Sequence, residues 1–188
     1  ALIKLDKLTD AQTVYEQARV KGASGEAFDQ LEQRLSKLNI NPQHPPSNQL
    51  KSIINLYTQG QLQQALFQAT EMLETFPNLV VLYNIAGASN AGLNQVDAAI
   101  DYYKQALKLK PDYAEVYSNM GAALKDRGDL DAAIDSYKQA LKIKPDYAEV
   151  YNNMGLALRV KGDLEAAINS YKQALMINSE FADAYNNM

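Results

Sequence analysis

A stretch of 34 residues recurs along this chain. Residues 114–147 and 148–181 agree at 22 of 34 positions, and the same spacing links Pro77, Pro111 and Pro145. A fixed period of this length is typical of stacked supersecondary units, in which each unit buries its apolar face against the next one. We therefore predict a repeat array rather than one globular core.

Each copy of the repeat predicts a pair of helices. Within 114–147, apolar residues follow the helical period of about 3.6 residues over Val116–Leu124 and again over Leu130–Ile143. Gly128 lies between the two patterns, where a residue that tolerates positive φ ends a helix at little cost. Asp129 follows as a candidate N-cap of the second helix. The unit is therefore predicted to be a helix–turn–helix.

Charged residues and a proline mark the boundary with the next copy. Lys142 and Lys144 lie near the end of the second helix, where the helix dipole favours positive charge. Pro145 then stops that helix, because the residue before a proline is disfavoured in the α conformation. Asp146 and Glu149 predict a capping box for the following helix.

A glycine recurs in the middle of the first helix, at Gly121 and at the matching positions Gly87 and Gly155. Glycine in a helix interior costs roughly 1 kcal/mol relative to alanine, so its recurrence indicates a packing reason. We predict that the paired helices approach too closely there for a larger side chain. Ala133 of the second helix, with its counterparts in the other copies, is predicted to face the glycine.

The motif Tyr-x-x-Met-Gly-x-x-Leu, followed by Gly-Asp-Leu, Ala-Ala-Ile, Tyr-Lys-Gln-Ala-Leu and Pro, resembles the tetratricopeptide repeat (TPR). The resemblance covers roughly residues 46–188, about three quarters of the chain. The first copy departs from it, because Gln49 and Ile53 stand where the repeat has an aromatic residue and a glycine. The resemblance implies an all-α fold, a right-handed α-solenoid of stacked antiparallel helix pairs.

The chain is predicted to have two parts. Residues 1–45 are predicted to form an N-terminal helical pair and a proline-rich linker, with helices from about Thr9 and over about Glu26–Leu38. A coiled-coil-like dimerisation helix is the alternative for this part, although its heptad pattern is short. Residues 46–188 are predicted to form the TPR array, divided into 46–79, 80–113, 114–147, 148–181 and a partial fifth repeat, 182–188.

The partial fifth repeat predicts an exposed last helix. Repeat arrays normally close with a helix whose outer face is polar, but Tyr185 and Met188 would lack a partner here. Either more repeats follow in the natural protein, or the uncapped C-terminal helix associates with another molecule. A homo-oligomer is one such association.

The residue inventory argues against catalysis within the chain. His44 is the only histidine and lies in the proline-rich linker, and there is no cysteine. A Ser/His/Asp or Cys/His set cannot be assembled, and the common zinc ligand sets are missing. No glycine-rich phosphate loop follows a strand. We therefore predict no enzyme activity, no catalytic residue, no metal and no cofactor.

Charge and hydropathy narrow the partners and the location. The net charge is −4 and the pI is about 5.0, which argues against nucleic acid as the main partner. No apolar run approaches the ~18–20 residues that span a bilayer. The start of the chain lacks the apolar region of a signal peptide. We predict a soluble, cytoplasmic protein that binds neither nucleic acid nor membranes.

The first helices of such stacked pairs line the concave side, so their polar positions form a groove. Asparagine recurs there although it is a poor helix former in mid-helix. A side-chain amide has both a donor and an acceptor, which suits it to holding the backbone of an extended peptide. The alternative is that these asparagines serve the fold through local hydrogen bonds. The predicted groove residues are Asn84, Asn119, Asn152, Asn153, Asn186, Asn187, Lys125 and Arg159.

The two cations in this set have two interpretations. Lys125 and Arg159 could meet an acidic stretch of a partner, or they could be solvated helix ends. The carboxylate clamp that holds chaperone tails needs cations beside the asparagines. Glu115 and Glu149 are among the residues at the matching places, and only Lys51 has the right charge. The sequence therefore argues against clamp-type chaperone binding.

The leading hypothesis is a protein–protein interaction module whose concave groove binds an extended peptide or a partner protein. The groove asparagines resemble those of O-linked N-acetylglucosamine transferases, and the array is similar to bacterial TPR regions attached to such glycosyltransferases or to sulfotransferases. The resemblance implies a second hypothesis, the substrate-recruiting region of a larger enzyme. A third hypothesis is a self-assembling scaffold, driven by the last helix and the N-terminal pair.

Overall fold

The structure, a computed structural model, describes residues 47–188 together with residues 25, 29 and 30. The chain divides into two compact units, Ala1–His44 and Pro45–Met188. The predicted N-terminal helical pair, the proline-rich linker and His44 lie outside the described residues.

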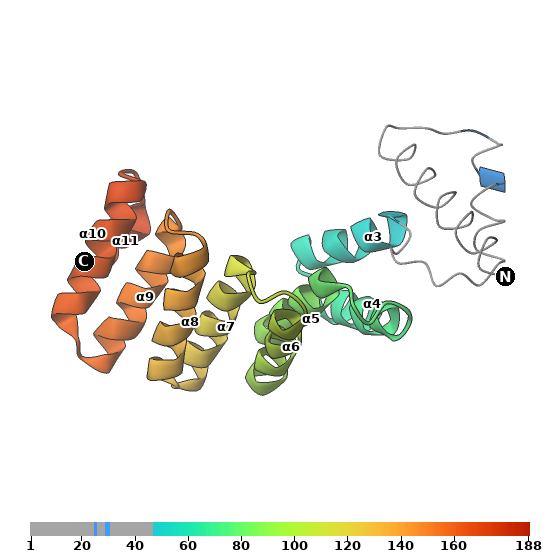
Figure 1. The fold of residues 1–188 in the computed structure, drawn as a ribbon, viewed down its shortest axis with the longest axis horizontal. Coiled ribbons are helices and arrows are strands. Elements are labelled where there is room, and N and C mark those ends of the chain that lie inside the picture. The colour runs from blue at the N-terminus through green and yellow to red at the C-terminus, as the bar shows by residue number, and fades with distance from the viewer. Residues whose placement is uncertain (1–24, 26–28, 31–46) are drawn as a thin grey trace, which may run out of the picture. The chain divides into compact units, whose positions relative to one another are not determined.

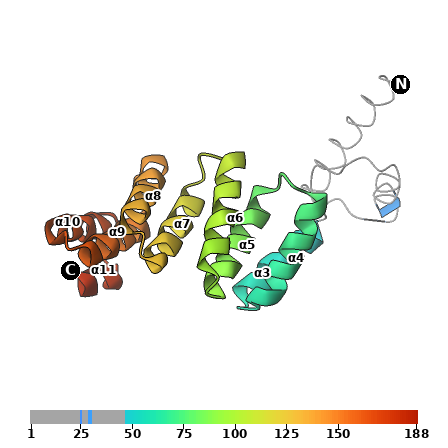
Figure 2. The same cartoon turned by 90° about the horizontal axis from the view of Figure 1, so that it is seen from below.

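Residues 47–188 are α-helical apart from short connections. In Figures 1 and 2 the helices from α3 to α11 are stacked side by side in the order of the sequence. Helices alternate between the first and the second member of a pair. The predicted fold class, an all-α solenoid of stacked helix pairs, is confirmed. The helices of this segment are α3 (Ser47–Thr58), α4 (Leu62–Thr75), α5 (Val80–Gly92), α6 (Val96–Leu109), α7 (Ala114–Arg127), α8 (Leu130–Ile143), α9 (Ala148–Lys161), α10 (Leu164–Ile177) and α11 (Ala182–Asn187).

The two kinds of helix pack differently along the array. Each helix contacts the next one in the chain, and every first helix also contacts the first helix of the following pair, from α3 with α5 to α9 with α11. Within residues 47–188 no comparable packing joins the second helices to one another. Since the closer-packed row of a curved array lies on its concave side, the first helices α3, α5, α7, α9 and α11 form the inner wall.

The turns between paired helices have the predicted conformation. Gly128 ends α7 and Gly162 ends α9, each with φ of 93°, and the amide of Asp129 bonds back to the carbonyl of Leu124 at 2.9 Å. Asn94, which stands at the matching place after α5, also takes a positive φ, 62°. A left-handed residue is therefore a property of this turn, and asparagine supplies it where glycine is missing.

One predicted cap is confirmed and the other is wrong. Asp129 is the N-cap of α8 as predicted, although its carboxylate accepts a hydrogen bond from Arg127 Nε at 2.8 Å instead of one from the helix backbone. The predicted capping box of Asp146 and Glu149 is wrong, because Tyr147 is the N-cap of α9 and its side chain makes no cap hydrogen bond. Lys144 Nζ lies 4.2 Å from the centroid of the Tyr147 ring, so a cation–π contact holds this turn.

The recurring glycines face tyrosine rings. A Cβ atom on Gly121 would lie 2.6 Å from the ring of Tyr137, and one on Gly87 or Gly155 would lie 2.5 Å from the equivalent ring of Tyr103 or Tyr171. The prediction that no larger side chain fits is confirmed. The nearest atoms in each pair belong to the tyrosine of the second helix, which was not predicted to face the glycine, and not to the predicted neighbour, Ala133.

Candidate functional site

Three junctions along the inner wall place the same repeat positions beside one another. Hydrogen bonds join the fifth residue of one repeat to the second and sixth residues of the next at the first junction, and to the sixth residue alone at the third. The same repeat positions define the second junction. The fifth residues are Asn84 in α5, Ser118 in α7 and Asn152 in α9. All three side chains are buried, at 7 %, 8 % and 5 % exposure.

The Asn84 junction is closed by two hydrogen bonds. Asn84 Nδ2 donates to Glu115 Oε1 at 3.0 Å, and Asn84 Oδ1 accepts from Asn119 Nδ2 at 3.1 Å. The amide therefore uses both its donor and its acceptor to tie α5 to α7. Glu115 was not among the predicted groove residues, although it stands in the first turn of α7.

The Asn152 junction repeats half of this arrangement. Asn187 Nδ2 donates to Asn152 Oδ1 at 3.0 Å, which ties α9 to α11. Arg159 Nη1 adds a hydrogen bond to the backbone carbonyl of Asn187 at 3.2 Å. Asn187 is half-buried, and Asn186 beside it is exposed.

The Ser118 junction lacks both hydrogen bonds. Ser118 stands where the other junctions have asparagine, and its hydroxyl lies one bond closer to the backbone than an amide does. Within residues 48–188, neither Asn153 nor Glu149 forms a side-chain hydrogen bond or an ion pair. Asn153 is half-buried and Glu149 is exposed, so both face a surface that solvent or a ligand can reach.

The two predicted cations are engaged inside the chain. Lys125 is half-buried, and its Nζ lies 2.7 Å from Asp126 Oδ1. Arg159 is exposed and makes the bond to the Asn187 carbonyl given above. The charge of Lys125 is therefore partly compensated, whereas the neutral carbonyl leaves the charge of Arg159 in place.

Tyr113 and Tyr147, at the starts of the first helices α7 and α9, lie close to the carboxylates of the inner wall. Burial raises the pKa of Tyr147 above its ordinary value, and the negative charges of Glu115 and Glu149 raise it further. Burial likewise raises the pKa of Tyr113, with the charge of Glu115 adding to the shift. Tyr147 thus lies in the field of two successive carboxylates of the inner wall.

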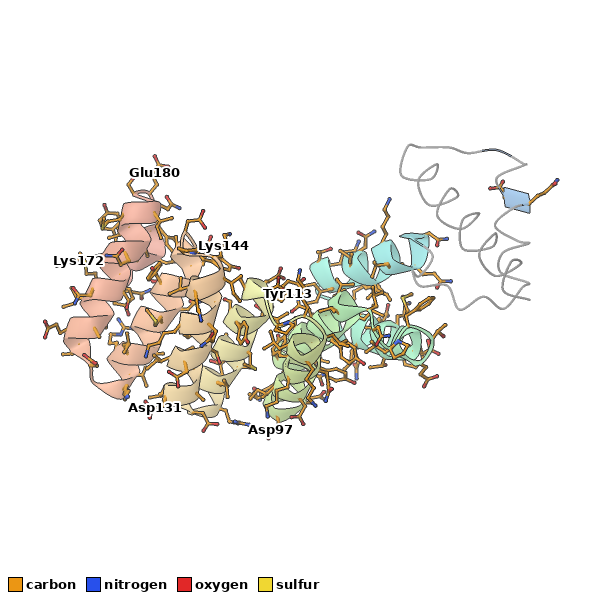
Figure 3. The ribbon with its side chains drawn as sticks, in the orientation of Figure 1. Asp97, Tyr113, Asp131, Lys144, Lys172 and Glu180 are labelled. Atoms are coloured by element: carbon orange, nitrogen blue, oxygen red, sulfur yellow. The ribbon has the colours of Figure 1, made fainter. Side chains whose placement is uncertain are left out.

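Ion pairs join neighbouring repeats at the opposite edge. Arg127 Nη1 lies 2.8 Å from Asp97 Oδ1, and Lys161 pairs with Asp131 in the same way one repeat later. Figure 3 shows Asp97 and Asp131 along the lower edge of the array, with Tyr113 and Lys144 toward the other edge. The two edges of the array therefore differ in chemistry.

The sequence signal for the amide pairing was a spacing of 35 residues. The bonds join Asn84 to Asn119 and Asn152 to Asn187, each pair being one residue further apart than the repeat. A comparison at the 34-residue period groups residues that occupy the same place, and it does not reveal which places touch. The side-chain pairing was missed for this reason.

The described part of the chain contains neither a candidate metal site nor a candidate membrane span. Among residues 25, 29–30 and 47–188, no group of three or more His, Asp or Glu side chains could hold a metal ion. None of the helices in those same residues combines the length and the apolar character that crossing a bilayer requires.

The family comparison agrees with the stacked pairs. The model of the TPR repeat matches residues 92–126, 123–159 and 155–188, which together cover just over half of the chain. The chain therefore belongs to the TPR repeat family. No curated protein matches it in sequence.

Solved structures with the same fold include three informative neighbours. MamA is 26% identical, with a TM-score of 0.68 over 90% of this chain and 96% of that one. YrrB, described as a TPR protein with an unusual peptide-binding site, is 18% identical, with a TM-score of 0.67 over 98% of this chain and 85% of that one. The first TPR of Spaghetti (RPAP3), bound to the HSP90 peptide SRMEEVD, is 20% identical, with a TM-score of 0.56 over 57% and 85%.

Proposed function

We propose that this protein is a non-catalytic interaction module whose inner wall binds an extended peptide segment of a partner protein. The observation that carries the proposal is the row of side-chain amides on successive first helices. Asn119, Asn153 and Asn187 occupy the same place on α7, α9 and α11, and all three are half-buried rather than enclosed. Two TPR proteins of the same fold are described with a bound peptide or a peptide-binding site.

The spacing of this row suits an extended backbone. Packed helices lie about 8–10 Å apart, and an extended chain advances about 3.3 Å per residue. One asparagine would therefore meet the backbone at about every third peptide residue. Asn119 and Asn187 each use one N–H within the array, which leaves the second N–H of the amide and its oxygen for a peptide. Each amide can therefore still donate to a carbonyl and accept from an N–H, so the contacts need no particular peptide sequence.

Selection of random peptides displayed on phage tests this function. Peptides selected on the immobilised chain are then titrated with purified variants by fluorescence anisotropy. Changing Asn119 and Asn153 together to Ala is expected to weaken binding about tenfold, the effect of losing one or two net hydrogen bonds. Asn169→Ala is the matched control, because this exposed asparagine lies on the second helix α10.

Two results contradict the proposal. One is a selection that returns no binding peptide. The other is a set of peptides that bind the double variant as tightly as the unchanged chain. Thermal unfolding of each variant, followed by circular dichroism, separates a lost contact from a lost fold.

Self-association is a second candidate, supported by apolar side chains at the α10–α11 end. Leu164 and Ile168 of α10 are 60 % and 38 % exposed, whereas Ile134, the counterpart of Ile168 in α8, is 5 % exposed. A second copy could cover this face and form a homo-oligomer. Sedimentation equilibrium at high concentration tests it, since a monomer there would remove the candidate and the scaffold hypothesis with it.

Two narrower predictions belong to the same proposal. The array could recruit substrates for an attached glycosyltransferase or sulfotransferase, which the complete open reading frame would decide by the presence of such a domain. The module is proposed to work in the cytoplasm, as predicted from its sequence. Fractionation of cells that produce the full protein would test the location.

A further inference from the structure

The three junctions differ in what they leave for a ligand. At Asn84, the carboxylate of Glu115 and the amide of Asn119 each form one hydrogen bond with Asn84. At Ser118, the equivalent pair is Glu149 and Asn153, and neither has a side-chain partner within residues 48–188. One residue, serine in place of asparagine, thus separates an occupied junction from an open one.

The open pair has a defined geometry. Glu149 and Asn153 are four residues apart on α9, so their side chains lie on the same face, with Cβ atoms about 5–6 Å apart. A carboxylate can only accept hydrogen bonds, whereas the amide can both donate and accept. This combination matches a peptide residue with a cationic side chain and an adjacent backbone amide.

Charge along the inner wall favours the same ligand. The second residues of α7, α9 and α11 are Glu115, Glu149 and Asp183, which form an acidic row beside the asparagines. Lys125, a cation of the same wall, is already paired with Asp126. Arg159 keeps its charge, but it lies in the last turn of α9, whereas Glu149 lies in the first turn. The charge at the Ser118 junction is therefore negative.

We infer that the Ser118 junction is the specificity site of the inner wall, where Glu149 binds a Lys or Arg side chain of an extended peptide and Asn153 holds the neighbouring peptide backbone. This inference rests on the proposed peptide-binding function and adds the chemical class of the partner, a cationic segment. The Ser118 side chain is too short to form a hydrogen bond with the Glu149 carboxylate or the Asn153 amide, so both groups remain open to a peptide.

The other repeats supply the variants that test the role of Ser118. Asparagine already stands at this place in α5 and α9, so Ser118→Asn fits the backbone of the array. It is expected to donate to Glu149 and to accept from Asn153, which closes the junction. The reverse change, Asn84→Ser, is expected to open a second junction by releasing Glu115 and Asn119.

Fluorescence anisotropy with three labelled peptides measures the effect. The probes alternate Lys and Ser, Glu and Ser, or Gly and Ser, and the full chain is titrated at low ionic strength because exposed charges are screened by salt. The Lys–Ser peptide is expected to bind about tenfold more tightly than the Glu–Ser peptide, the scale of one charge-assisted hydrogen bond. Glu149→Gln and Ser118→Asn are each expected to lose most of that difference, and Asn84→Ser to increase it.

A charge control and a fold control accompany these variants. Glu71→Gln removes one exposed carboxylate from α4, a second helix away from the inner wall, and is expected to leave binding of the Lys–Ser peptide unchanged. An equal loss in Glu71→Gln and Glu149→Gln would mean attraction by net charge alone, and would overturn the inference. Thermal unfolding of Ser118→Asn shows whether the array is intact.

The remaining outcomes are also decisive. Unchanged binding in a folded Ser118→Asn variant, preference for the Glu–Ser peptide, or no binding of the Lys–Ser peptide would each overturn the inference. The proposed function would survive any of these, since peptides selected from the random library decide it separately. Failure of that selection would remove both.

Discussion

The interior of each helix pair and the junction between pairs follow different rules. Inside the pairs, a glycine of the first helix faces a tyrosine ring of the second so closely that a Cβ atom on it would lie 2.5–2.6 Å from the ring, and three successive repeats share this arrangement. At the junctions, the fifth residue changes from Asn84 to Ser118 to Asn152, and the hydrogen bonds change with it. What is constant along the array therefore builds the fold, and what varies along it creates a site.

The largest expected loss of stability comes from disturbing the contact between the glycine and the tyrosine inside a helix pair. Gly121→Leu brings its side chain into the ring of Tyr137, because even a Cβ atom would lie 2.6 Å from that ring. We expect a loss of about 1–3 kcal/mol in the free energy of unfolding, measured by denaturant titration. Ala122→Leu is the matched control, since Leu156 occupies the same place one repeat later. Equal stability of the two variants would contradict the packing described here.

A substitution at the closed Asn84 junction is expected to cost less stability than one inside a helix pair, but more than one at the open Ser118 junction. Asn84→Ala leaves Glu115 and Asn119 without their partner, and we expect a loss of about 1 kcal/mol or somewhat more. Asn153→Ala removes a side chain that makes no hydrogen bond within the described residues, so a change within about 0.5 kcal/mol is expected. Equal losses in both variants would show that the two junctions do not differ as observed.

Substitution of Tyr137, which packs against Gly121, is expected to change the free energy of unfolding by a small amount that depends on pH. The Tyr137 hydroxyl is buried and has no hydrogen-bond partner among residues 48–188, so Tyr137→Phe is expected to be neutral or to stabilise by up to about 1 kcal/mol. Burial raises the pKa of Tyr137 above its ordinary value of 10.0. The folded chain therefore keeps this proton when the unfolded chain releases it.

The sign of the pH effect follows from that proton. Stability is fully present below pH ~10 and falls as the pH rises above it, because unfolding then releases a proton. The free energy of unfolding measured from neutral to alkaline pH is expected to fall less steeply in Tyr137→Phe than in the unchanged chain. An identical slope in both would argue against burial as the cause of the shift.

The smallest effect is expected at the ion-paired edge. Arg127 pairs with Asp97 of the preceding repeat and with Asp129, and all three side chains are exposed. Water and salt screen such pairs, so Arg127→Gln is expected to lower the melting temperature less than Asn84→Ala does. The difference should shrink further in high salt. A larger loss than that of Asn84→Ala would mean that the edge and not the amide pairing joins the repeats.

The repeat period was enough to predict the helices and their turns. The helices predicted over Val116–Leu124 and Leu130–Ile143 are α7 and α8 of the structure, and Gly128 takes the left-handed conformation between them. Each of these features is local or repeats in place, so one sequence contains the whole signal.

Contacts between different positions of the repeat could not be predicted from the sequence. The partner of Gly121 is Tyr137 and not Ala133, and the N-cap of α9 is Tyr147 and not Asp146. The amide pairs join positions 35 residues apart, which needs the distance between neighbouring first helices. Which asparagine faces a ligand depends on that pairing, so the role of Ser118 could be argued only from the structure.

Nuclear magnetic resonance of the side-chain amides tests the central claim most directly. A chain labelled with ¹⁵N is titrated with the Lys–Ser peptide, and the NH₂ signals of Asn153, Asn119 and Asn187 are followed. We expect the Asn153 signal to shift most, because Asn119 and Asn187 already donate to Asn84 and Asn152. Shifts confined to residues of the second helices, with Asn153 unchanged, would contradict it.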